Sequence, residues 1–475
     1  MAGSWTDTVL STASNPAGTG LVVVAGMARD FLEHRASSRV ASPETAGLGE
    51  ALAQYNFAEP RALEEVASDV FRLLSDYSVR SDHPRYFGLF NPPAKDSAIA
   101  GDLIAATVNP QLAVWSHAPA AAEIENKLVR FMGQLIWPSA PVAGTFTSGG
   151  TEANHTALLA ALSRRYPDWA TRGVQSLKAR PAIYASSESH LAWIKIARSA
   201  GLGSDAVRLV TPSDGLALTS AELSHAIRKD TGYDPVLIVG TAGTTAHGAV
   251  DDLHGLAAVA ARHDAHFHVD AAWAGGGLLH PDVQQILDGI ARADSVTLDP
   301  HKWLSVPMAC GMYLARSWEA LTQAFSVSTS YMPSASVEHH DAYIHSLQWS
   351  RRFIGLKLFM ALATDGLPGY QAMIQRQLEL GTYLKARLKE EGWHIKNASK
   401  LPLVCFAPAE QPADEQVLRI ERAVADSGDA WISSVRVRKS LVLRACITSF
   451  ESTHEDVDAL MGLLADARAS CNGRG

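Results

Sequence analysis

The chain has 475 residues, of which 47% are hydrophobic and 19% are charged, and its formal net charge is −8. This composition is typical of a soluble globular protein, and the length predicts two or three domains or one large α/β core. Because the negative charge is spread along the chain, the composition argues against a nucleic-acid-binding protein.

The first 20 residues lack the basic segment of a secretory signal peptide, and the apolar stretch LVVVAGM that follows is far shorter than the roughly 20 residues needed to span a bilayer. The four cysteines are widely separated and lack the spacing of a metal site, which predicts reduced and mostly buried thiols. We therefore expect a cytoplasmic protein without a metal ion and without a membrane segment.

Residues 1–95 contain two amphipathic helical patterns and the proline-broken HPRYFGLFNPPAK, and they predict a helical N-terminal segment. From about residue 141 to 315, short β-branched runs alternate with helical patterns. The runs lack strict polar–apolar alternation, as strands buried on both faces of a parallel sheet do. This order predicts a doubly wound α/β domain, which we place at residues 96–345. Strands are expected at 181–187, 235–243, 265–273 and 294–299.

After residue 349, two long helical patterns precede the strand patterns LPLVCFAP and SLVLRACI, and further helices are expected at about 413–427 and 454–468. These elements predict an α+β C-terminal domain over residues 346–475. Just before it, residues 327–346 have no clear periodicity, and a long irregular stretch in a compact protein is often functional.

The segment GTFTSGGTEAN predicts a strand that turns at Gly149 and Gly150 into a helix beginning near Thr151. Backbone N–H groups and the helix dipole at such a turn favour an anion such as phosphate. Alone, the motif equally describes a glycine-rich turn that binds nothing, and it is not a P-loop because the Gly-Lys-Ser/Thr ending is missing.

Asp270 ends one expected strand, and Lys302 follows the end of a later one. A buried carboxylate at the ligand-facing edge of a sheet needs a partner, although an aspartate that caps local backbone amides is the more common case. For the lysine, the ordinary interpretation is an ion pair with Asp299, but a buried amine has a lowered pKa and becomes nucleophilic. Together with the anion cradle, the amine and the acid fit a phosphorylated pyridine aldehyde, because the amine can form an imine and the acid can pair with the ring nitrogen.

With these motifs the chain resembles the group II pyridoxal-phosphate-dependent decarboxylases, the aromatic-L-amino-acid and glutamate decarboxylase group. TSGGTEAN, HVDAAWAGG and DPHKW match its main motifs in order, and HPRYFGLFNP, WSHAPAAAEIE, WSRRF and LVLRACI extend the similarity over nearly the whole chain. The resemblance implies the fold-type I, aspartate-aminotransferase-like architecture with a mostly parallel sheet of the seven-stranded type. It also implies a homodimer with active sites at the subunit interface.

The resemblance further implies that pyridoxal 5′-phosphate is the cofactor. By this comparison Lys302 is the Schiff-base lysine, Asp270 is the partner of the pyridinium nitrogen, and His190 stacks on the cofactor ring. His190 alone would suggest a cap at a helix start or a surface residue. The other cofactor-site residues that the resemblance implies are Gly149, Gly150, Thr151, Thr241, His301 at the substrate side and, from the partner subunit, Ser350.

Two positions depart from the family pattern. Asp299 stands where several members have asparagine, and an acid beside a phosphate would be repulsive, so we expect it to act through a neighbour. The family's mobile loop carries a tyrosine that returns a proton to the substrate from the neighbouring subunit. Tyr343 is our candidate for it in a slightly shorter loop, with His339 and His340 as alternatives that are more simply explained as solvated histidines.

The segments YFGLFNP and QLAVWSHAP match the family's substrate pocket, and they suit an aromatic or large apolar side chain. Glutamate is less expected as the substrate, because Arg85 is the only extra basic residue nearby. The candidate pocket residues are Leu89, Phe90, Asn91, Ala113, Trp115 and His117.

The expected reaction is therefore decarboxylation of an L-amino acid to the corresponding amine and CO₂. An oxygen-dependent decarboxylating aldehyde synthase of the same family is the alternative, and the presence of Tyr343 argues against it. A cofactor-binding regulator without turnover is a remote second alternative, because no basic helix-turn-helix segment accompanies the motifs.

Overall fold

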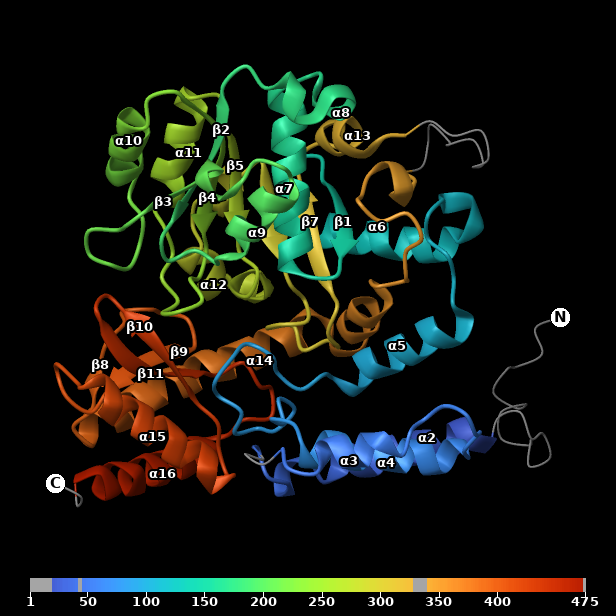
Figure 1. The fold of residues 1–475 in the computed structure, drawn as a ribbon, viewed down its shortest axis with the longest axis vertical. Coiled ribbons are helices and arrows are strands. Elements are labelled where there is room, and N and C mark those ends of the chain that lie inside the picture. The colour runs from blue at the N-terminus through green and yellow to red at the C-terminus, as the bar shows by residue number, and fades with distance from the viewer. Residues whose placement is uncertain (1–18, 42–44, 328–339, 473–475) are drawn as a thin grey trace.

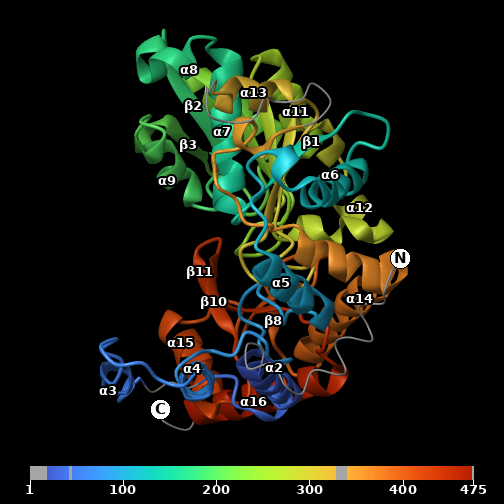
Figure 2. The same cartoon turned by 90° about the vertical axis from the view of Figure 1, so that its right-hand side faces the viewer.

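The computed structural model describes residues 19–41, 45–327 and 340–472. It has two layered parts, one built on a seven-stranded sheet and the other on a four-stranded sheet (Figure 1). Figure 2 shows that the two parts lie at opposite ends of the molecule, with α5 (Asp96–Val108) and the long α14 (Leu356–Glu390) between them. None of the helices in the described ranges combines the length and the apolar character needed to cross a bilayer.

The seven-stranded sheet is mostly parallel, because every strand runs in the same direction except β7. This topology confirms the predicted fold class. The four expected strands are present as β2, β4, β5 and β6, although β5 ends three residues before its expected end. In spatial order the strands are β1 (Ala143–Thr147), β7 (Gly311–Ala315), β6 (Ser295–Leu298), β5 (His266–Asp270), β4 (Tyr233–Thr241), β2 (Arg180–Ser186) and β3 (Val207–Val210).

Helices cover both faces of this sheet, and the side chains of each strand alternate between the faces. In β4, Ile238 packs into the apolar cluster on one face, whereas Leu237 and Val239 pack into the cluster on the other. Both sets are buried, which explains why the strand sequences lack polar alternation. One face carries α6 (Pro119–Gln134), α10 (Ser220–Lys229) and α11 (Leu253–Arg262), the other carries α7 (Gly150–Arg165) and α9 (Ala192–Ser199), and α8 (Trp169–Arg172), α12 (Pro281–Ile286) and α13 (Glu319–Phe325) are short.

The C-terminal part has its own apolar core between an antiparallel sheet and helices. The expected helices and the two expected strands are present, whereas the edge strands β8 and β10 were not expected. The long α14 is interrupted at Gly366, whose φ of +64° is not helical. The sheet order is β10 (Ser433–Val437), β11 (Ser440–Cys446), β9 (Leu403–Ala407) and β8 (His394–Ile395), covered by α15 (Asp414–Ser427) and α16 (His454–Asn472).

The N-terminal helices lie at the same end of the molecule as the C-terminal part (Figures 1 and 2). Phe31 and Phe71 join α2 to α4 with ring centroids 5.3 Å apart. Several large apolar side chains of the N-terminal helices remain exposed, which is unusual for a monomer surface. The helices are α2 (Thr19–Glu33), α3 (Leu48–Ala53) and α4 (Leu63–Asp76), and the exposed side chains include Leu21, Val22, Leu63 and Leu74.

Candidate active site

A cavity of about 340 Å³ lies at the edge of the large sheet where β1, β4, β5 and β6 end. Because these four strands run in the same direction, their carboxyl ends meet at this edge, which is the usual ligand-binding edge of an α/β sheet. The cavity brings together most of the residues that the sequence singled out. Its lining includes Gly149, Gly150, Thr151, His190, Thr241, Asp270, Asp299, His301 and Lys302.

The anion cradle is the turn from β1 into α7. A Cβ atom at Gly150 would lie only 2.9 Å from Oδ2 of Asp299 and 3.3 Å from the Cβ atom of Ala272, so only glycine fits at this position. Glu152, in the first turn of α7, accepts hydrogen bonds from the backbone N–H and the hydroxyl of Ser148, each at 2.7 Å. The helix N-terminus thus opens into the cavity beside Gly149 and Gly150, as an anion site requires.

A buried hydrogen-bond chain holds the Asp270 carboxylate at the end of β5. Its Oδ2 accepts a hydrogen bond from the side-chain amide of Asn154 at 2.8 Å, and its Oδ1 accepts one from the backbone N–H of Ala272 at 3.1 Å. The Oδ1 atom of Asn154 accepts a hydrogen bond from Thr297 at 2.7 Å and lies 3.0 Å from Nε2 of His268. Burial holds the pKa of His268 well below its usual value, so this ring is neutral. The chain therefore orients the Asn154 amide as a donor to the side chain of Asp270.

Lys302 reaches the cavity from the turn after β6. Its Nζ lies 3.0 Å from Oδ2 of Asp299, and a quarter of the side chain remains exposed. The adjacent His301 has Nδ1 2.8 Å from the carbonyl oxygen of Cys310, and burial lowers the pKa of this histidine. The ion pair that the sequence suggested as the ordinary interpretation is thus present, and it holds the amine in the cavity rather than at the outer surface.

His190 and Thr241 form the opposite wall. Nδ1 of His190 accepts a hydrogen bond at 3.2 Å from the backbone N–H of Ala192, the first residue of α9, and His190 lines the cavity. The Thr241 hydroxyl lies 2.6 Å from that of Ser189, and its backbone N–H donates to Asp251 at 2.8 Å. Burial raises the pKa of Asp251 to about 7.

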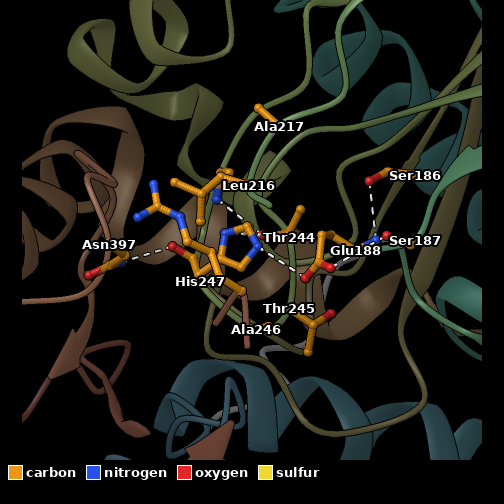
Figure 3. A network of polar contacts seen from close by, with 12 residues as sticks. Ser186, Ser187, Glu188, Leu216, Ala217, Thr244, Thr245, Ala246, His247 and Asn397 are labelled. Atoms are coloured by element: carbon orange, nitrogen blue, oxygen red, sulfur yellow. Dashed lines mark hydrogen bonds and ion pairs between the residues drawn. The ribbon is translucent and has the colours of Figure 1, made fainter. Parts of the chain in front are cut away.

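A network that the sequence did not suggest supports this wall from behind. Figure 3 shows the ring of His247 between Glu188 and Thr244. Nε2 of His247 lies 3.2 Å from Oε2 of Glu188, Nδ1 lies 3.0 Å from the Thr244 hydroxyl, and the ring is fully buried. The backbone carbonyl of His247 accepts a hydrogen bond from Asn397 of the C-terminal part at 2.8 Å. Because Glu188 is two residues before His190, the network joins the turn of that histidine to the C-terminal part.

The guanidinium group of Arg444 ties three segments together behind the cavity. It donates to the backbone carbonyl oxygens of Thr245 at 2.5 Å and Gly88 at 2.8 Å, and to the hydroxyl of Ser433 at 3.1 Å. It also lies 5.6 Å from the ring centroid of Phe90. Arg444 lies in the quoted LVLRACI segment, but the sequence alone did not indicate its contacts.

One half of the expected substrate pocket lies beside the cavity. Phe90 is buried and stacks on Trp273, with ring centroids 4.4 Å apart, and Trp273 lines the cavity. The side-chain amide of Asn91 lies 3.2 Å from the sulfur atom of Met308, which also lines the cavity. Leu89 precedes them and is 37% exposed.

The other half is located elsewhere in the same chain. Ala113 and the turn Trp115–His117 precede α6, and the backbone N–H of Tyr343 donates to the Ala113 carbonyl at 3.1 Å. Tyr343 is 7% exposed, packs near Trp349 and does not line the cavity. Ala113, Trp115, His117 and the exposed Ser350 are also not among the described residues that line the cavity. Of the alternative histidines, His340 stacks on Trp318 at 3.9 Å, and His339 lies outside the described residues.

A mostly parallel sheet with an amine, a carboxylate and an anion cradle at one edge defines a fold-type I pyridoxal-phosphate enzyme. A family model described as the pyridoxal-dependent decarboxylase conserved domain matches residues 50–408. The chain belongs to this family, and it is a pyridoxal-phosphate-dependent amino acid decarboxylase.

Its relatives include enzymes with different substrates. The chain is 32% identical to the cysteine sulfinic acid decarboxylase of Mus musculus over 343 residues, which cover 70% of this chain and 69% of that protein. It is 30% identical to tryptophan decarboxylase 1 of Oryza sativa subsp. japonica over 394 residues, covering 77% and 76% of the two chains. A crystal structure of Oryza sativa TDC with PLP and tryptamine superposes with a TM-score of 0.88 at 25% identity, covering 97% of this chain and 99% of that one.

The residues at the sheet edge fit pyridoxal phosphate. A Cβ atom at Gly150 would fill the cradle, so the glycine leaves the space that a phosphate needs to approach the backbone. The amine of Lys302 can form an imine with an aldehyde, and the carboxylate of Asp270 can accept a hydrogen bond from a pyridinium nitrogen.

Proposed function

We propose that the enzyme decarboxylates aromatic or large apolar L-amino acids to amines. The observation that supports this proposal is the apolar wall of the cavity, where Phe90 stacks on Trp273 beside Met308. Lys302 is the only lysine or arginine among the described residues that line the cavity, so an acidic side chain would lack a second cation. Arg85, the basic residue considered from the sequence, pairs with Asp456 at 2.9 Å instead.

Within this proposal each cavity residue has a role. When bound, pyridoxal phosphate supplies a pyridinium ring that accepts the electron pair released with CO₂. Lys302 would provide the amine that binds the aldehyde carbon, and Asp270 would keep a proton on the ring nitrogen. His190 would contact the ring, and Thr241 would lie beside it. Gly149, Gly150 and Thr151 would hold the phosphate, and His301 would border the substrate.

A panel of purified L-amino acids tests the substrate class. Tryptophan, phenylalanine and tyrosine are expected to give CO₂ and the matching amines, identified by mass spectrometry, and cysteine sulfinate, aspartate and glutamate little or none. A clear preference for the acidic substrates would overturn the proposal. Hydrogen peroxide and ammonia, assayed in the same samples, separate amine formation from the oxygen-dependent aldehyde reaction.

We further propose that the enzyme is a homodimer whose partner subunit supplies Tyr343 as the proton donor and Ser350 as a cofactor contact. Support comes from their position outside the cavity of their own chain and from apolar side chains exposed on α5. For the same reason we propose that Ala113, Trp115 and His117 reach the substrate pocket of the partner subunit. The exposed α5 side chains are Leu103, Ile104 and Val108.

Co-expression of two differently tagged inactive variants tests the shared site. Hybrid dimers of Lys302→Ala and Tyr343→Phe contain one site with both native residues, so about a quarter of the native amine formation is expected from a mixed population. Each variant expressed alone is expected to form almost no amine. Hybrids that form no more amine than the two parents would refute the shared site.

Two further assignments remain part of the proposal. The division at residues 1–95, 96–345 and 346–475 is supported by the separate apolar core of the C-terminal part. A cytoplasmic location is supported by the buried free thiols of Cys310, Cys405 and Cys446, as expected in a reducing compartment. Fractionation of the native cells tests the location, and limited proteolysis tests the boundaries.

A further inference from the structure

Asp299 is one of three acidic residues among the described residues that line the cavity, with Glu152 and Asp270, and its charge opposes the proposed phosphate. It follows β6 directly and is 1% exposed. Its Oδ2 lies 3.0 Å from Nζ of Lys302 and 3.8 Å from Nε2 of His301. Its Oδ1 is buried and has no hydrogen-bond partner among the described residues. One of its two oxygens is therefore left without a donor, which is costly for an ionised carboxylate.

The Asp299 carboxylate lies directly beside the anion cradle. A Cβ atom at Gly150 would lie 2.9 Å from Oδ2, and a Cβ atom at Gly311 would lie 2.8 Å from Oδ1. Two glycines thus leave the space that this side chain occupies. A phosphate held at the start of α7 would face Asp299 across the same cavity, because the carboxylate and the cradle line it together.

The other charged groups around Asp299 do not offset an added phosphate. Among the described residues that line the cavity, Lys302 is the only lysine or arginine, and burial lowers the pKa of His301. Lys357 already forms an ion pair with Asp102 at 3.0 Å and donates a hydrogen bond to the Met308 carbonyl oxygen. The remaining titratable groups that face the cavity or Asp299 are Glu152, His190, Asp270 and the buried thiol of Cys310.

We propose that Asp299 takes up a proton when the phosphate group of the cofactor binds, and that the resulting carboxylic acid donates a hydrogen bond to the phosphate. A hydronium ion or buffer acid in the solvent gives up the proton, so one bond to hydrogen breaks there and one O–H bond forms on Asp299. The acid then replaces the side-chain amide that an asparagine would present, and the repulsion between two anions is removed. This inference rests on the proposed phosphate site at Gly149–Thr151. Its consequence is that cofactor affinity falls as pH rises.

Calorimetry with 4′-deoxypyridoxine 5′-phosphate isolates this step, because the ligand carries the phosphate but has no aldehyde for Lys302. Titrations at pH 7.5 in buffers of different ionisation enthalpy give the number of protons taken up on binding. The native protein is expected to take up close to one proton more than Asp299→Asn. Its dissociation constant is expected to rise by up to about tenfold per pH unit between pH 7 and 8, with a much flatter profile for the variant.

Asp234→Asn is the matched control. Asp234 is also mostly buried and pairs with Arg165 at 2.7 Å. It lies near the amino-terminal end of β4, whereas the cavity lies at the carboxyl end of this strand. This variant is expected to take up the same number of protons as the native protein. Circular dichroism checks that Asp299→Asn is folded, and Asp299→Ser repeats the measurement with a different neutral side chain.

The outcomes separate the inference from the function on which it rests. Equal proton uptake and equal pH profiles in the native protein and in both Asp299 variants would overturn the inference and leave the phosphate site intact. No binding of the phosphorylated ligand or of pyridoxal phosphate by the native protein would overturn the site and the inference together.

Discussion

Replacing Asn154 by alanine tests whether the buried hydrogen-bond chain holds Asp270. The substitution removes the donor to Asp270 at 2.8 Å and the acceptor that lies 2.7 Å from the Thr297 hydroxyl and 3.0 Å from Nε2 of His268, which keep only their mutual contact at 3.2 Å. A hydrogen bond to a charged group contributes roughly 1.5–3 kcal/mol, and a buried polar group left unpaired costs roughly 1–3 kcal/mol. Because the cavity lets water reach Asp270, we expect the free energy of unfolding to fall by about 3–5 kcal/mol rather than by the full sum.

Urea unfolding of the cofactor-free protein measures this loss, followed by circular dichroism and by tryptophan fluorescence so that coincident transitions justify a single free energy. Cofactor affinity, from the quenching of tryptophan fluorescence, is expected to weaken at least tenfold because the carboxylate is no longer oriented. Asn56→Ala is the control, since its amide oxygen accepts only an exposed backbone N–H at 2.9 Å, and its effect should stay within about 0.5 kcal/mol. A loss below about 1 kcal/mol for Asn154→Ala, with unchanged affinity, would refute the role of the chain.

Three further changes test other parts of the site. Gly150→Ala puts a methyl group 2.9 Å from a buried carboxylate oxygen, so it should raise the cofactor dissociation constant at least tenfold in the same fluorescence titration. Gly462→Ala is the control and should leave this constant unchanged, because no heavy atom lies within 4 Å of the added methyl group. His247→Phe removes the contacts of the ring with Glu188 and with the buried Thr244 hydroxyl, and it should lower the free energy of unfolding by roughly 1–3 kcal/mol; an unchanged melting temperature would contradict this. The pKa of Asp251 is raised to about 7, so its contribution to stability is present at low pH and lost as pH rises from about 4 to 7. Urea midpoints should show the native protein losing stability relative to Asp251→Asn across that window, and parallel profiles would exclude the titration.

The sequence predicted those helices and strand ends that depend on a local pattern of residues. Strand ends are marked by glycine, proline and aspartate, so the positions of Asp270 and Lys302 near one edge of the sheet follow from the sequence pattern alone. The C-terminal helices were also predicted, because their apolar spacing is regular. By contrast, β7 runs antiparallel between β1 and β6, and a short apolar strand does not encode the direction of its neighbours.

The missing parts of the site depend on contacts between distant segments. His247 meets Glu188 across 59 positions, and Arg444 reaches Gly88 across 356. Neither pair has a spacing that could distinguish it from ordinary surface or core residues. Tyr343 illustrates a different limit, since its proposed role requires a second copy of the chain and stays a prediction.

The clamp made by Arg444 has a consequence for how substrate preference can change. It holds Gly88 and Thr245 by their backbone carbonyl oxygens, so the anchor does not depend on which side chains follow. A Cβ atom at Gly88 would lie 2.0 Å from the ring of Trp431, which fixes that position as glycine. Positions 89–91 are therefore carried on a backbone that is secured independently of their identity. If these positions belong to the substrate pocket as proposed, their side chains can be exchanged to change selectivity while the backbone that carries them keeps its course.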